Sequence, residues 1–185
     1  MSTKKLGMQT QIINKGYQPK LSEGAAIPPV FRTSTFCFRN SAEGKRAFEI
    51  AYGLKQQQKD ECPALIYSRV NNPNFEIVEE RMTAFSGTDA AALFSSGMGA
   101  ISSTCLAFLR PGDALLFSDP VYGGTEYLFR HILPTLGIKT IPIQARSSKE
   151  TLEQCIKNNK NVKISYLESP ANPTMTLSDV RAAAN

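Results

Sequence analysis

Apolar and polar positions alternate in regular blocks along most of this 185-residue chain. Short apolar runs at 114–117, 139–143 and 162–167 have the length of strands, and a further run at 90–94 predicts a short buried strand. Strands that alternate with helices at this spacing favour right-handed crossovers and a mainly parallel sheet with helices on both faces, an α/β fold. Helices are predicted at 73–86, 100–109 (a buried one), 123–133, 148–156 and from about 178.

Helix starts are marked by local capping patterns. Asn72 followed by Pro73 is typical of an N-cap and a first helical residue, and Ser147 with Glu150 resembles a capping box. In the helix predicted at 73–86, apolar residues recur on one face, and Gly87 provides the stop. That face comprises Phe75, Val78, Met82 and Phe85.

The first sixty residues follow a different pattern. The prolines at 28–29 exclude a regular helix, and the β-branched and aromatic stretch at 33–38 predicts extended chain. Asn40 with Glu43 resembles a capping pair that opens a helix through about Leu54. This region has too few apolar positions for a core of its own. We therefore expect residues 1–62 to form an arm that lies on another part of the protein, and residues 63–185 to form a separate domain.

Composition places the chain among soluble globular proteins. Hydrophobic residues make up 42% and charged residues 20%, and no apolar run is long enough to cross a bilayer. The first residues lack the apolar core of a secretory signal, so we expect a cytoplasmic protein. The net charge of +5 is scattered, which favours a solvated surface over nucleic-acid binding. The four widely spaced cysteines and single histidine predict free thiols and no metal site.

Three loops follow predicted strands and carry unusual residues. In a parallel sheet such loops meet at one edge, where ligands bind. Gly97 and Met98 lie in a small-residue turn before a helix, where free backbone N–H groups can hold a phosphate. Tyr122 could stack on a flat cofactor. Asn172 lies between two prolines that orient its amide.

Each loop alone also has a plainer interpretation: a tight glycine-rich turn, a tyrosine packed on the sheet edge, or an ordinary Asn-Pro turn. Together they predict a site for a planar, phosphorylated cofactor. Upstream, Arg69 and the nearby phenol of Tyr67 offer further phosphate donors, although an arginine in a polar loop is also a common surface feature.

These motifs together resemble the Cys/Met-metabolism enzymes that depend on pyridoxal 5'-phosphate. Tyr-Ser-Arg-x-x-Asn-Pro at 67–73, Ser-Ser-Gly-Met-x-Ala-Ile at 95–101, Tyr-Gly-Gly-Thr at 122–125 and Glu-Ser-Pro-x-Asn-Pro-Thr at 168–174 occur in the family's order. Residues 24–36 are similar to the family's N-terminal arm. The family includes cystathionine γ-synthase, cystathionine lyases, methionine γ-lyase and O-acylhomoserine sulfhydrylases. The resemblance implies a fold-type-I transferase with residues 63–185 as part of its cofactor-binding large domain.

The resemblance also implies a role for each site residue. Gly97 and Met98 would donate backbone N–H groups to the cofactor phosphate, and Tyr122 would stack on the pyridine ring and assist proton transfer. Asn172 would bond the phenolic oxygen. Tyr67 and Arg69 would bind the phosphate in a partner subunit of a homodimer or homotetramer. The implied chemistry is loss or exchange of a γ- or β-substituent on a sulfur amino-acid substrate.

The chain departs from the family at one point. The Schiff-base lysine and the acidic partner of the pyridinium follow the last loop in the family, and neither motif occurs within residues 1–185. We therefore expect this stretch to be an N-terminal portion, with the rest of the large domain and a small domain absent, and to be inactive alone. A non-catalytic remnant that binds or oligomerises is the alternative. Gly124 stands where methionine γ-lyases often carry cysteine, which favours the cystathionine-handling members.

Overall fold

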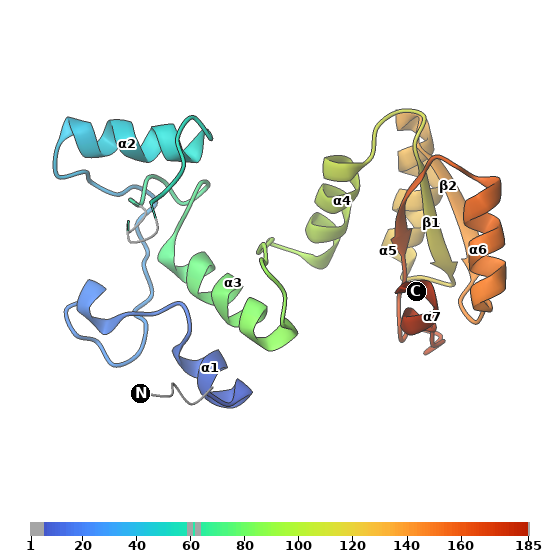
Figure 1. Cartoon of the computed structure of the whole chain (residues 1–185), viewed down its shortest axis with the longest axis horizontal. Helices are drawn as coiled ribbons and strands as arrows, with labels where there is room; N and C mark the ends of the chain where they lie inside the picture. Colours follow the sequence, from blue (N-terminus) through green and yellow to red (C-terminus); the bar gives the residue numbers. More distant parts are fainter. Residues whose placement is uncertain (1–5, 59–60, 62–63, 185) are drawn as a thin grey trace. The chain divides into compact units, whose positions relative to one another are not determined.

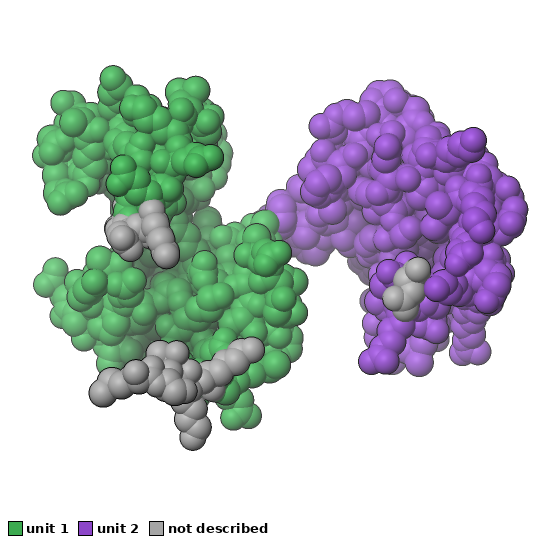
Figure 2. Space-filling view, in the orientation of Figure 1, with its two compact units in different colours: residues 1–93 green, residues 94–185 purple. Residues whose placement is uncertain are grey.

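The chain forms two compact units, Met1–Leu93 and Phe94–Asn185, in a computed structural model that describes residues 6–58, 61 and 64–184 (Figures 1 and 2). Unit 2 contains the sheet and three of the four predicted site loops, and unit 1 contains the fourth. Each unit is described by itself below.

Unit 2 is built on a three-stranded parallel sheet in the order β2-β1-β3. The central strand β1 (Ala114–Asp119) is buried along almost its whole length, and β2 (Lys139–Gln144) and β3 (Val162–Tyr166) flank it. A central strand of a parallel sheet is buried on both faces, so its side chains are continuously apolar, as in Ala-Leu-Leu-Phe. The predicted parallel sheet and three of its strands are confirmed.

Helices cover both faces of this sheet. Leu115 and Phe117 of β1 pack with residues of α4 (Gly97–Phe108) and of the helical segment that begins with α5 (Gly123–Tyr127). Leu116 points the other way, toward Leu152 of α6 (Lys149–Asn158), as period-2 alternation requires. Figure 1 shows α5 and α6 on opposite sides of the strands. After α5, the chain continues through a π-helical turn η2 (Leu128–Ile132) and a 3-10 turn η3 (Leu133–Leu136), three residues beyond the predicted end.

Three helix starts in unit 2 differ from their predicted positions, and the largest difference is at α4, which begins at Gly97, three residues before the predicted start. The N-cap of α6 is Ser148, whose hydroxyl accepts from the Thr151 backbone N–H, so the predicted cap at Ser147 is one residue early. The last helix α7 (Val180–Ala184) begins two residues after Ser178. Serines at 147 and 148 offer equivalent hydroxyls, and the backbone path after β2 selects the second.

The predicted buried strand at 90–94 is wrong. These residues are irregular, four of the five are exposed, and the boundary between the two units falls among them. A strand needs a neighbouring strand for its backbone hydrogen bonds, and none pairs with this segment in the described part of the chain. The run is apolar enough for a strand but lacks a partner.

The prediction of a buried helix at 100–109 is correct for the helix and wrong for its burial. Within α4, Cys105 is the one buried residue, while Leu106 and Phe108 are more than half exposed. One face of α4 therefore packs on the sheet, and its other apolar residues face solvent.

Unit 1 consists of helices and extended chain. Its elements are α1 (Met8–Asn14), the short 3-10 turn η1 (Pro19–Leu21), α2 (Ser41–Ala51) and α3 (Pro73–Ser86). Asn40 caps α2 by accepting from the Glu43 N–H, and Asn72 caps α3, both as predicted. The helix after Asn40 ends at Ala51, three residues before its predicted end.

The first described helix, α1, and the residues after it lie on α3. The Arg81 guanidinium donates to the carbonyl of Ile13 over 2.8 Å, and the Lys15 ammonium lies 3.4 Å from the Glu80 carboxylate. The amphipathic face of α3 does not face a core within the described residues. Its members Phe75, Val78, Met82 and Phe85 are each 40–57% exposed, and the buried positions of α3 are Ile77 and Thr83.

Candidate functional site

The carboxyl edge of the sheet in unit 2 brings three predicted loops together. The loop after β1 leads through Tyr122 into α5, the loop after β3 begins at Glu168, and α4 begins at Gly97. Because β1 and β3 are parallel, the loops after them share one edge. The turn at Gly97 follows no strand of the sheet, and Met98 joins it to this edge through Gly124. Hydrogen bonds and side-chain contacts, described next, connect these loops directly.

The N-terminus of α4 is shaped to receive an anion. Ser96 is the N-cap, and its hydroxyl accepts from the Gly99 N–H over 3.0 Å. The N–H groups of Gly97 and Met98 have no acceptor within the helix, since they lie in its first turn. A Cβ added at Gly97 would meet no heavy atom within 4 Å, so the space beside Gly97 is open. An anionic group can approach these N–H groups, which the helix dipole also favours.

Tyr122 lies against this helix start. A Cβ added at Gly124 would lie 2.8 Å from Cε1 of Tyr122 and 3.2 Å from the sulfur of Met98, so both side chains rest on the glycine. The buried Thr125 hydroxyl contacts the same sulfur over 3.7 Å. Tyr122 as a whole is 46% exposed. The structure therefore brings Met98 and Tyr122 together and leaves the ring accessible.

Glu168 joins the loop after β1 to the loop after β3. One oxygen of its carboxylate accepts from the Tyr122 backbone N–H and the other from the Asn172 backbone N–H, each over 2.9 Å. Sequence reasoning quoted this glutamate within a motif but gave it no role. A carboxylate two residues after the end of β3, four residues before the predicted asparagine, was the signal that could have drawn attention to it.

The backbone of Glu168 is held at both ends as well. Its N–H donates to the hydroxyl of Ser118, a fully buried residue of β1, over 3.0 Å, and its carbonyl accepts from the Ser178 hydroxyl over 3.1 Å. The side chain of Glu168 thus extends from a position set by the sheet itself.

The floor of this edge is apolar and closely packed. Tyr166, at the end of β3, lies edge-on to Phe129 with ring centroids 5.1 Å apart, and burial raises the pKa of its phenol. Arg130 binds Asp119 over 2.9 Å and lies over the Phe117 ring. These contacts attach the end of β1 to the helix that follows Tyr122.

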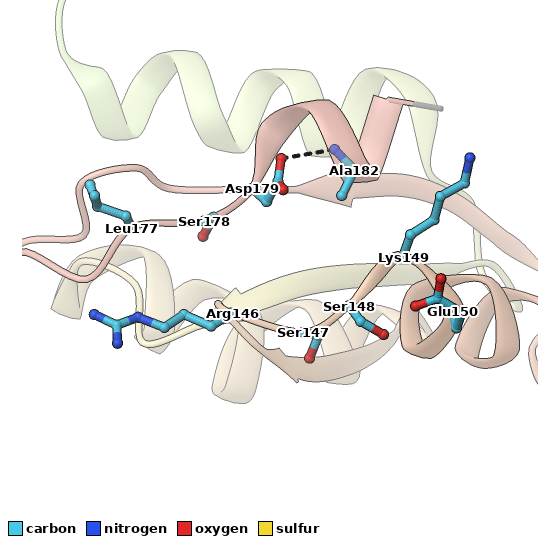
Figure 3. Close-up of a pocket in the computed structure, with 9 residues that line it drawn as sticks. All are labelled: Arg146, Ser147, Ser148, Lys149, Glu150, Leu177, Ser178, Asp179 and Ala182. Atoms are coloured by element: carbon cyan, nitrogen blue, oxygen red, sulfur yellow. Dashed lines mark hydrogen bonds between the residues drawn. The ribbon is translucent and has the colours of Figure 1, made fainter.

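A shallow hollow of about 640 Å³ lies on the α6 side of the sheet, between the start of α6 and the segment that leads into α7 (Figure 3). Arg146 and Lys149 line it together with Glu150 and Asp179, so it has no net preference for one sign of charge. Asp179 accepts from the Ala182 N–H over 2.9 Å, which occupies it in the first turn of α7.

In unit 1, Tyr67 and Arg69 lie together. The guanidinium carbon of Arg69 is 5.5 Å from the centre of the Tyr67 ring, and Tyr67 is 38% exposed. Tyr67 forms an antiparallel bridge with Thr35 of the extended stretch. Asn71 holds the loop closed by accepting from the Ile66 N–H and donating to the Ala64 carbonyl. The loop is therefore ordered by its own amides and presents the tyrosine and arginine side by side.

The other reactive groups lie elsewhere. Lys139 and Lys163 belong to the amino-terminal halves of β2 and β3, and the Lys139 ammonium donates to Asn159. Cys37 is exposed, Cys105 is buried and Cys155 is half-buried, all as free thiols, and Cys62 lies outside the described residues. Within residues 6–58, 61 and 64–184, no cluster of three His, Cys, Asp or Glu side chains could hold a metal ion, and no helix could span a membrane.

A sequence profile of the Cys/Met-metabolism PLP-dependent enzymes matches residues 9–185. The chain belongs to this family. The family's cofactor is pyridoxal 5'-phosphate, and the α/β fold with a parallel sheet agrees with membership. The predicted resemblance is confirmed.

Curated relatives match almost the whole chain. L-methionine gamma-lyase of Pseudomonas putida is 34% identical over 99% of this chain and 43% of its own length. Homocysteine synthase of Schizosaccharomyces pombe is 30% identical over 95% of this chain and 38% of its own length. The chain therefore spans about two fifths of the length of the curated relatives it matches.

Solved structures share the fold. The metB protein of Corynebacterium glutamicum has a TM-score of 0.77 at 26% identity, over 97% of this chain and 41% of its own. A putative O-acetylhomoserine (thiol)-lyase of Campylobacter jejuni has a TM-score of 0.81 at 23% identity, over 97% of this chain and 42% of its own, and was solved with a pyridoxyl-lysine phosphate group. This second likeness supports the fold alone.

The residues of unit 2 fit part of the family's cofactor. The open N-terminus of α4 suits a phosphate, and the half-exposed Tyr122 ring beside it suits a flat aromatic group. Glu168 accepts two backbone N–H groups at this edge, so its carboxylate is already engaged. Unit 2 therefore has, at one sheet edge, a helix N-terminus with free N–H groups and an accessible aromatic side chain.

Proposed function

We propose that the protein carrying this chain uses pyridoxal 5'-phosphate in sulfur amino-acid metabolism, by γ-elimination or γ-replacement on cystathionine, an O-acylhomoserine or methionine. One observation carries this proposal. The α4 N-terminus, the Tyr122 ring and the Asn172 loop are tied into one sheet edge by Gly124 and Glu168. Family membership supplies the identity of the group that such an edge would hold.

Each residue has a defined task in this proposal. Gly97 and Met98 donate backbone N–H groups to the cofactor phosphate, where the helix dipole adds to the attraction. Tyr122 stacks on the pyridine ring and assists proton transfer, and the Asn172 amide binds the phenolic oxygen. When bound, the cofactor supplies an electron sink for carbanion chemistry at the amino-acid substrate.

Tyr67 and Arg69 are proposed to bind the phosphate in a second copy of the protein. A guanidinium and a phenol in contact offer several donors for phosphate oxygens. In that arrangement the active site is complete only in a homodimer or homotetramer. The test is to mix an Arg69→Ala variant with a Tyr122→Phe variant, each weakened alone. Recovery of activity in the mixture, to about a quarter of the wild-type level for random dimers, supports the shared site. No recovery contradicts it.

We also propose that residues 1–185 by themselves do not form the covalent bond to the cofactor. None of their lysines lies in a Ser-x-Thr-Lys context, and Lys139 and Lys163 begin strands away from the carboxyl edge. Borohydride reduction after incubation with pyridoxal 5'-phosphate, followed by peptide mass spectrometry, should find no single preferred lysine. A stoichiometric adduct at one lysine would contradict this.

The activity itself is tested on the protein that carries these residues. Release of an α-keto acid from methionine and from cystathionine, and exchange of O-acetylhomoserine with a thiol, are measured side by side. The cystathionine-handling assignment from Gly124 predicts the highest kcat/KM with cystathionine. The curated relatives include methionine lyases and a homocysteine synthase, so both of those reactions belong in the assay. Absence of all three reactions together with absence of cofactor binding would favour the non-catalytic alternative. The cytoplasmic location stays a prediction.

A further inference from the structure

Glu168 holds the backbone of both Tyr122 and Asn172, the two residues whose side chains are predicted to bind the ligand. Its two carboxylate oxygens accept from the N–H groups of Tyr122 and Asn172, which are 50 residues apart in the chain, over equal distances of 2.9 Å. A carboxylate is the side chain suited to this task because it offers two acceptor oxygens and no donor. Hydrogen bonds to a charged acceptor are also stronger than neutral ones.

The position of this carboxylate is itself determined from two sides. The Ser118 hydroxyl, at the end of the central strand, accepts from the Glu168 N–H, and the Ser178 hydroxyl donates to the Glu168 carbonyl. Ser118 is fully buried, so its contact with Glu168 is part of the sheet. The Tyr122 and Asn172 loops are therefore both hydrogen-bonded to one carboxylate whose position the sheet fixes.

We propose that Glu168 is a positioning residue that sets the spacing between the Tyr122 ring and the Asn172 amide. This inference rests on the proposed function, because the two loops matter as a pair only if one flat ligand contacts both. The arrangement acts through backbone N–H groups, so it controls where each loop lies and leaves both side chains free for the ligand. Without Glu168, the loops lose their only common hydrogen-bond partner in the described part of the chain.

Substitution of Glu168 has different consequences for different replacements. In Glu168→Gln, the amide oxygen can accept one N–H, but the amide nitrogen then faces the second N–H with a donor of its own. In Glu168→Asp, the charge remains but the side chain is one methylene shorter and cannot reach both loops. Glu153→Gln is the matched control, since Glu153 lies on α6 and pairs with Lys157 at the surface.

The first readout needs no cofactor. In ¹⁵N-labelled chain 1–185, the amide protons of Tyr122 and Asn172 should resonate downfield, as expected for bonds to a carboxylate. Both should move upfield or broaden in Glu168→Gln and Glu168→Asp, and neither should move in Glu153→Gln. Unchanged resonances of Tyr122 and Asn172 in both Glu168 variants would overturn the proposal, provided that circular dichroism shows both variants folded.

The second readout is the affinity for pyridoxal 5'-phosphate, measured by equilibrium dialysis on the protein that carries these residues. Loss of one charge-assisted hydrogen bond that positions the ring should weaken binding about tenfold in Glu168→Gln. If wild-type protein binds no cofactor, the proposed function fails, and the amide resonances still decide whether Glu168 holds the two loops. If wild type and both Glu168 variants bind equally well, the positioning role is overturned and the proposed function stands.

Discussion

At the scale of single residues, the contact between Gly124 and Tyr122 determines where the aromatic ring lies. The ring and the Met98 sulfur occupy the space that a side chain at 124 would need. Gly123, its neighbour in the same helix, has no such contact. The two glycines therefore form a natural pair for comparison.

We expect Gly124→Ala to displace the Tyr122 ring and Gly123→Ala to leave it in place. The added methyl group at 124 would lie 2.8 Å from the ring, closer than carbon atoms approach. At 123, alanine should raise the free energy of unfolding by about 0.5–1 kcal/mol, because alanine favours helix over glycine. Ring resonances of Tyr122 and urea unfolding measure the two effects. Equal ring shifts in both variants would contradict the contact.

Glu61 gives a second prediction at this scale. Its hydrogen bond from Arg46, with a further one from the Gln58 N–H, lowers the pKa of the Glu61 carboxyl from 4.5 to about 2. A carboxyl whose pKa is lower in the folded state stabilises that state above its unfolded pKa, and the stabilisation is lost as the pH falls through the folded pKa. Unfolding free energy should therefore drop between about pH 4.5 and 2.

Glu61→Gln should remove that part of the pH dependence. The control is Glu23→Gln, since Glu23 has no hydrogen bond or ion pair with any residue that the structure describes. Urea unfolding of each variant is followed between pH 2 and 6. A wild-type slope that persists in Glu61→Gln would mean that other carboxyls produce it.

At the scale of elements, caps and strands show what could be predicted from sequence. Asn72 and Asn40 were predictable as N-caps because a cap accepts from a backbone N–H only two or three residues further along the chain. The irregular structure of the apolar run at 90–94 was not predictable, because a strand depends on a partner strand that local sequence does not specify. The contact of Gly124 with Met98, and the bond from the Tyr122 N–H to Glu168, were also beyond local patterns, since they join segments distant in the chain.

The N-cap of α4 provides the prediction at this scale. Ser96→Ala removes the acceptor for the Gly99 N–H and should lower the free energy of unfolding of unit 2 by about 1 kcal/mol. Ser103→Ala, an exposed serine in the middle of the same helix, is the control and should change it by less than about 0.5 kcal/mol. Urea denaturation followed by circular dichroism measures both. Equal effects would mean that the hydroxyl of Ser96 does not stabilise the helix.

At the scale of the whole molecule, the exposed surface is large for the mass. The chain of 20.3 kDa exposes 13288 Å². Two separate compact domains of half this mass would together expose about 10,600 Å². The excess includes many large apolar side chains, among them the face of α3. Apolar surface of this extent is typical of surfaces that associate.

We therefore expect chain 1–185 to bind a hydrophobic dye such as anilinonaphthalene sulfonate while folded. Replacing Val78 by Thr and Phe85 by Gln should reduce the dye fluorescence, because both side chains lie on the exposed face of α3. The free energy of unfolding should change by less than about 0.5 kcal/mol per substitution, as is usual at exposed positions. Replacing the buried Leu133 by Thr is the contrasting variant, and it should destabilise unit 2. Dye fluorescence that the α3 substitutions leave unchanged would place the binding surface elsewhere.

The hydrogen bonds made by Glu168 have a consequence for how this site can diversify. They are received from main-chain N–H groups, which every amino acid except proline possesses. The hydrogen bonds that hold positions 122 and 172 therefore do not depend on which side chains those positions carry. Substitutions at these two positions can alter the chemistry of the site while its architecture is inherited unchanged. Proline is the exception, since at either position it would remove the hydrogen bond that this position donates to Glu168.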